Sequence, residues 1–118
     1  MSELPFRVAE ACTLPTVERP ARSAEWGSLF REVIAAESRG SQWGRLRFPV
    51  DAALERRVRV VASRESSSCS FFTFQVSEGV DAAGAETMIL DVSVPPSQSA
   101  VLDAFIAWAE GVRTGRLA

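Results

Sequence analysis

Residues 87–94 read TMILDVSV, and every second side chain in this stretch is apolar. Because successive side chains of a β-strand point to opposite faces, this alternation predicts a strand with one buried face. Pro95 and Pro96 follow directly. Proline cannot donate a hydrogen bond to a sheet but suits the first turn of a helix, so we expect the last helix to begin near Ser97.

Three further segments with regular apolar patterns precede this strand. Residues 71–76 and residues 46–50 alternate like strands, and residues 51–68 carry an apolar stripe at helical spacing. The last helix has a similar stripe. Together these patterns predict a core made of Leu46, Phe48, Leu54, Val58, Val61, Phe72, Phe74, Leu90, Val92, Phe105 and Trp108.

The N-terminal part of the chain is less regular. Residues 1–22 contain three prolines and predict an extended arm packed on the body, after which Ser23 can cap a helix that starts at Ala24. Residues 32–38 either continue that helix or form a strand that turns at residues 39–42 into the next one. We favour the hairpin.

The expected fold class is therefore α+β, a two-layer sandwich. An ordered arm and a short helix precede a ββαββα unit, whose mainly antiparallel four-stranded sheet carries both long helices on one face. With 118 residues and 12.8 kDa, the chain has room for one core, so residues 23–118 are expected to form a single domain.

Composition excludes several function classes. The chain has no His, Tyr or Lys, and all 13 basic residues are Arg, which removes His-based triads, His metal sites and Schiff-base lysines. The net charge of −2 argues against nucleic acid as a partner, and the many arginines predict a solvated face of mixed charge. No signal peptide or apolar run long enough to span a membrane is evident, so a cytoplasmic protein with two free thiols is expected.

The sharpest local feature is the stretch from Glu65 to Cys69, at the junction of a predicted helix and a strand. Glu65 continues the apolar stripe of residues 51–68, and a buried carboxylate must find a partner or hold its proton. With Cys69 one turn later, the two residues are candidate catalytic groups, Glu65 as acid or base and Cys69 as nucleophile or helper. The plain alternative is a small buried cysteine and a glutamate bonded to Arg or to backbone amides.

The only other cysteine is Cys12, which lies in the predicted arm. Two thiolates and one glutamate do not complete a tetrahedral zinc site, but they suit a soft ion that needs fewer ligands, such as Cu(I) or Hg(II). Cys12, Cys69 and Glu65 are therefore candidate metal ligands, and we expect the arm to bring the two sulfurs within about 10 Å of each other.

Two stretches, ACTLPTVERPARSAEWGSLF (residues 11–30) and VASRESSSCSFFTF (residues 61–74), resemble a group of small actinobacterial cytoplasmic proteins. That group carries a CTLPT-x-E-x-P arm and an E-x-x-C-C-x-F-F-T-F junction. The resemblance implies a thiol site made of the arm cysteine and a cysteine pair, of the kind suspected in heavy-metal handling. In this chain Ser68 replaces the first cysteine of the pair.

Three functions remain open on this basis. The first is a cytoplasmic thiol protein that binds a soft metal ion or metalloid through Cys12 and Cys69 with Glu65 nearby. The second is a small-molecule enzyme of a biosynthetic pathway that uses Glu65 in an apolar pocket. The third is a domain that binds a partner or forms a homodimer without chemistry of its own.

Overall fold

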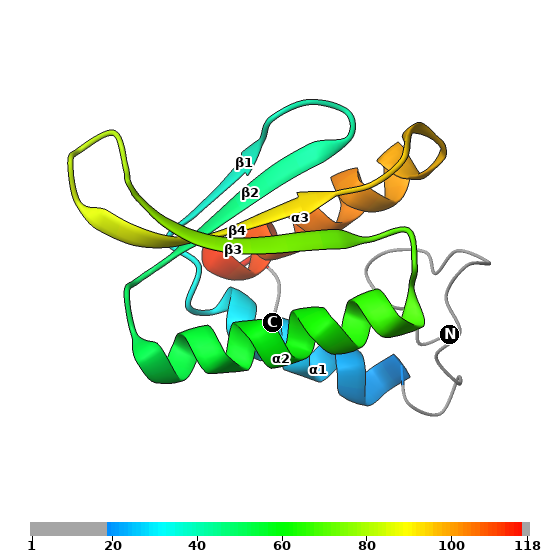
Figure 1. The fold of residues 1–118 in the computed structure, drawn as a ribbon, viewed down its shortest axis with the longest axis horizontal. Coiled ribbons are helices and arrows are strands. Elements are labelled where there is room, and N and C mark those ends of the chain that lie inside the picture. The colour runs from blue at the N-terminus through cyan, green and yellow to red at the C-terminus, as the bar shows by residue number, and fades with distance from the viewer. Residues whose placement is uncertain (1–18, 117–118) are drawn as a thin grey trace.

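The computed structural model describes residues 19–116 and has an α+β fold (Figure 1). This part of the chain forms, in order, α1 (Arg19–Phe30), β1 (Ala35–Ser38), β2 (Trp43–Phe48), α2 (Ala52–Ser68), β3 (Thr73–Val80), β4 (Glu86–Ser93), the short 3₁₀ helix η2 (Pro96–Gln98) and α3 (Ser99–Arg113). The predicted α+β class and the order ββαββα are confirmed. The predicted arm falls largely on residues 1–18, which lie outside the described residues.

The four strands form one antiparallel sheet in the order β1-β2-β4-β3. β4 lies in the middle, with Leu90 opposite Leu46 of β2 on one side and opposite Val76 of β3 on the other. Leu90 and Leu46 are fully buried, so the predicted inward register of these strands is confirmed.

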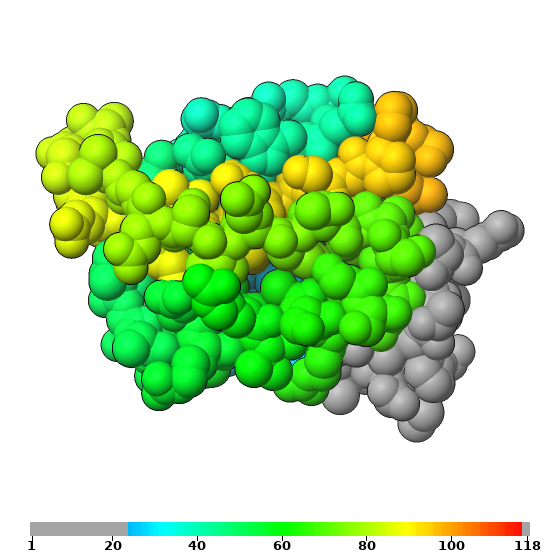
Figure 2. Space-filling model, viewed as in Figure 1, coloured from blue at the N-terminus to red at the C-terminus, as the bar shows by residue number. Residues whose placement is uncertain are grey.

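The helices form the second layer. α3 packs against β1 and β2, α2 packs against β3, and α1 contacts both of these helices. In Figure 2, α2 and β3 lie on the side that faces the viewer, and the tip of the β3–β4 hairpin projects from the rest of the molecule at the left. Every predicted core residue is buried except Phe74, which is half-buried and packs against the core.

Three predicted boundaries are wrong. The strand expected over residues 71–76 is β3, which begins at Thr73 and continues to Val80. α1 begins at Arg19 rather than Ala24, so Ser23 lies inside the helix, and Pro20 stands in its first turn. A proline there costs no hydrogen bond, since the first N–H groups of a helix have no partner within it. The strand expected over residues 46–50 ends at Phe48, and Val50 is 51% exposed.

Residues 32–38 form a turn followed by strand β1 and do not continue α1, so the favoured hairpin is the alternative that the structure has. Ala35 pairs with Arg47 in the hairpin of β1 and β2, and Glu37 accepts a hydrogen bond from Arg47 Nε at 3.2 Å. Short alanines alone are weak strand formers, so pairing with β2 and this cross-strand ion pair define β1.

The sheet positions that alternate with the core-facing ones carry polar contacts, and two of them, Arg47 and Thr87, are themselves buried. Arg45 on β2 lies opposite Asp91 on β4, and the two form a bidentate ion pair with Nε–Oδ1 at 2.8 Å. The hydrogen bond to Asp91 raises the pKa of Arg45. Arg47 donates to the hydroxyl of Thr87 at 2.8 Å. Within residues 19–116, no helix is both long enough and apolar enough to cross a membrane.

Candidate functional site

Cys69 lies at the C-terminal cap of α2, where the chain turns from the helix toward β3. Its N–H donates to the carbonyl oxygen of Glu65 at 2.7 Å, and its own carbonyl oxygen accepts from the N–H of Phe72 at 3.1 Å. The backbone of Cys69 is extended, with φ −124° and ψ 91°. These bonds hold Cys69 one helical turn from Glu65, the spacing that the sequence predicts.

Glu65 is buried, as its place on the apolar stripe of α2 predicts: only 4% of the residue is exposed. Its Oε1 accepts a hydrogen bond from the indole Nε1–H of Trp26 on α1 at 3.0 Å, across 39 positions of sequence. Trp26 is itself 1% exposed. The carboxylate is therefore a polar contact that joins two helices inside the core.

Cys69 is 3% exposed and is held in a disulfide. The expectation of a free thiol at this position is thus wrong for this state of the protein, in which no free cysteine is found among the described residues. The sequence reasoning took the lack of an export signal as evidence for thiols, a rule about compartments that does not fix any particular pair. Cys12 lies outside the described residues, so its distance from Cys69 stays a prediction.

The described residues bring Glu65 and Cys69 together at one junction, beside Ser68. Within residues 19–116, no cluster of three or more His, Cys, Asp or Glu side chains is arranged to hold a metal ion. A metal site built on Cys69 therefore needs ligands from outside this range, as the prediction with Cys12 assumes.

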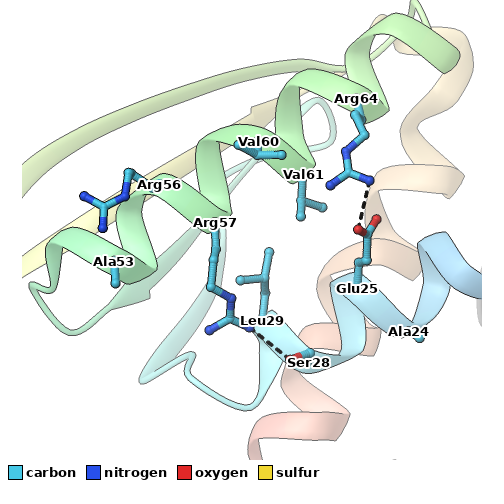
Figure 3. A pocket seen from close by; sticks show the side chains of 10 residues that line it. All are labelled: Ala24, Glu25, Ser28, Leu29, Ala53, Arg56, Arg57, Val60, Val61 and Arg64. Carbon is cyan, nitrogen blue, oxygen red and sulfur yellow. Dashed lines mark hydrogen bonds and ion pairs between the residues drawn. The ribbon is translucent and has the colours of Figure 1, made fainter.

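A separate groove lies between α1 and α2, with a volume of about 660 Å³ (Figure 3). Its lining combines five apolar side chains with three arginines, one glutamate and one serine. The residues are Ala24, Glu25, Ser28, Leu29, Ala53, Arg56, Arg57, Val60, Val61 and Arg64. Glu65 does not line this groove. The apolar pocket that the enzyme hypothesis requires around Glu65 is therefore not this one.

Sequence reasoning missed two features of this region. It assigned Trp26 only to an apolar stripe, although an indole N–H in a core usually finds an acceptor. Sequence reasoning also predicted correctly that Arg56 and Arg64 are exposed. It did not predict that α2 lies against α1, so it missed the groove that these arginines line. The available signal was the recurrence of Arg56, Val60 and Arg64 every fourth residue, which sets them along one line of the helix.

Comparison of the chain with protein-family models, with curated proteins and with solved structures finds no match. The resemblance carried by residues 11–30 and 61–74 therefore stays a prediction.

Proposed function

We propose that this protein binds a soft, thiophilic metal ion through Cys69 and Cys12 once the disulfide at Cys69 is reduced. The observation that carries the proposal is that Cys69, buried beside Glu65, already bonds to a second sulfur. Two sulfurs that can form a disulfide are already close together. After reduction they need to move apart only slightly to hold an ion between them, at ~2.3 Å from each sulfur.

The chemistry balances in two steps. An external dithiol reductant gives two electrons and two protons to the disulfide, forming two thiols on this chain and one disulfide on the reductant. The ion then replaces both thiol protons, which pass to solvent. Two thiolates give a neutral complex with Hg(II) and a singly negative one with Cu(I), ions that accept sulfur ligands readily.

Several features of the chain support this ion class over zinc. The chain has no His and only two cysteines, whereas structural zinc takes four ligands, mostly His and Cys. The proposal includes a reducing, cytoplasmic setting, because thiols persist there and a disulfide opens. The enzyme and the partner-binding alternatives stay predictions, with no described contact that favours either.

Native mass spectrometry of the full chain tests the proposal. After reduction, the protein should retain one equivalent of Cu(I) or Hg(II), and the oxidised protein, as the matched control, should retain none. Cys69→Ser and Cys12→Ser should each abolish retention. Ser68→Cys, which restores the predicted cysteine pair, should strengthen it.

Two results would contradict the proposal. One is a reduced, folded protein that takes up neither ion. The other is uptake that survives in the Cys12→Ser/Cys69→Ser double variant, since the ion would then sit elsewhere.

A further inference from the structure

We propose that the groove between α1 and α2 binds a small organic anion with an apolar body, a carboxylate or a phosphate monoester carried on a hydrocarbon group. The proposal uses neither Cys69 nor Glu65, so it stands or falls separately from the thiol site. The volume of about 660 Å³ lies within the ~300–1,000 Å³ usual for small-molecule sites.

The charges of the groove favour an anion. Three guanidinium groups line it, those of Arg56, Arg57 and Arg64, against the single carboxylate of Glu25. Glu25 pairs with Arg64 at 2.9 Å. The lining thus carries a net charge of +2. Because Arg64 pairs with Glu25, the excess positive charge lies on Arg56 and Arg57.

Those two arginines have donors to spare. Arg57 reaches across the groove and donates to the hydroxyl of Ser28 at 3.0 Å, a neutral partner that leaves its charge uncompensated (Figure 3). Arg56 makes no hydrogen bond or ion pair with any residue in the described part of the chain. A guanidinium has five N–H donors in a planar fork, which matches the oxygens of a carboxylate or phosphate.

The apolar side chains of the groove provide the surface on which the hydrocarbon part of the ligand would pack. Val60 lies between the two ends of the groove and is 50% exposed, above the buried Leu29 and Val61. Figure 3 shows Arg56 near one end of the groove and the Arg64–Glu25 pair at the other. An anionic head between Arg56 and Arg57 would place a hydrocarbon tail over Val60, pointing toward the neutralised end.

This arrangement separates the groove from an ordinary charged surface. Three exposed arginines outside the groove pair with a carboxylate close by in sequence: Arg39 with Glu37, Arg59 with Glu55 and Arg113 with Glu110. In the groove, cations flank an exposed valine and a buried apolar floor. A ligand with both an anionic and an apolar part satisfies both features, whereas an inorganic anion satisfies only the first.

Titration of the ¹⁵N-labelled full chain tests the proposal, with three probes that share one alkyl chain: octanoate, octyl phosphate and neutral 1-octanol, each below its micellar concentration. Octanoate or octyl phosphate should bind with a submillimolar Kd and shift the amide resonances of Ala53, Val60 and Val61. The tighter of the two anions identifies the head group. Octanol should bind at least tenfold more weakly than that anion.

Variants on the solvent side of α2 locate the site without disturbing the core. Arg56→Gln/Arg57→Gln should weaken anion binding at least tenfold, and Val60→Asp should do the same. Arg59→Gln, on the same helix but outside the groove, is the matched control and should change the Kd less than twofold.

Three titration results would overturn the proposal: neither anion binds, octanol binds as tightly as the better anion, or Arg59→Gln weakens anion binding as much as Arg56→Gln/Arg57→Gln does. A fourth result would also overturn it. In this case the wild-type protein binds no anion but sediments as a dimer, and Val60→Asp sediments as a monomer. The last result would assign the groove to a second copy of the chain.

Discussion

The hydrogen bond from Trp26 to Glu65 should stabilise the fold strongly, and Trp26→Phe tests this directly. Both residues are at most 4% exposed, so water cannot replace the lost donor without disturbing the core. A hydrogen bond to a charged group is worth about 1.5–3 kcal/mol. The smaller ring leaves ~40 Å³ unfilled, which adds ~1 kcal/mol at about 24 cal/mol per Å³.

The expected loss in the free energy of unfolding is therefore about 2.5–4 kcal/mol. In a domain of this size, that corresponds to a fall in Tm of at least ~10 °C. Guanidinium chloride unfolding followed by far-UV circular dichroism gives the free energy, with the disulfide kept oxidised in every sample. Trp43→Phe is the control, because Trp43 is 36% exposed and should change stability by less than about 0.5 kcal/mol.

A double-mutant cycle isolates the hydrogen bond from the change in ring volume. Glu65→Gln keeps an oxygen that can accept from Trp26 but removes the charge, so the bond should lose about half its strength. The cost of Trp26→Phe should then be smaller by ~1 kcal/mol in the Glu65→Gln background. A coupling energy below ~0.5 kcal/mol would refute the stabilising role assigned to this pair.

Three further predictions concern other parts of the fold. Asp51 caps α2 by accepting a backbone N–H at 2.8 Å, so Asp51→Ala should cost about 1 kcal/mol in chemical unfolding, and Asp51→Asn much less. A Cβ at Gly44 would lie 2.6 Å from Ile106 Cδ1, so Gly44→Ala should destabilise by ~1–3 kcal/mol, but not in an Ile106→Ala background that lacks that atom. The hydrogen bond from Arg113 lowers the pKa of Glu110, so this pair stabilises the fold above the ordinary glutamate pKa and stops doing so as pH falls through the lowered one. The small stability difference between wild type and Glu110→Gln should therefore disappear in unfolding curves at acidic pH, and a difference independent of pH would contradict this.

Local pattern was sufficient to predict most of the fold. The alternation in residues 87–94 placed β4, and the stripe in residues 51–68 placed both α2 and the buried side of Glu65. Each of these inferences depends on one strand or helix and on its apolar period, which tertiary contacts here reinforce. Gly115 takes a φ of +81° just beyond the end of α3, a conformation that glycine adopts readily at the end of a helix.

The site was less predictable, because its contacts join distant segments. The acceptor of the Trp26 indole lies 39 residues away, and nothing in either local sequence specifies that pairing. The groove arises only when α1 lies against α2, so its arginines look like ordinary solvated residues in the sequence. The disulfide at Cys69 likewise depends on a second cysteine that the sequence around Cys69 does not specify.

Neighbouring residues of α1 contact neighbouring residues of α2 in two different ways. Trp26 bonds to Glu65 inside the core, whereas Glu25 pairs with Arg64 at the surface, where Arg64 is 52% exposed. An exposed ion pair contributes at most about 1 kcal/mol, while the buried bond to a charged group contributes more. The buried bond therefore does more to hold α1 against α2 than the surface ion pair does.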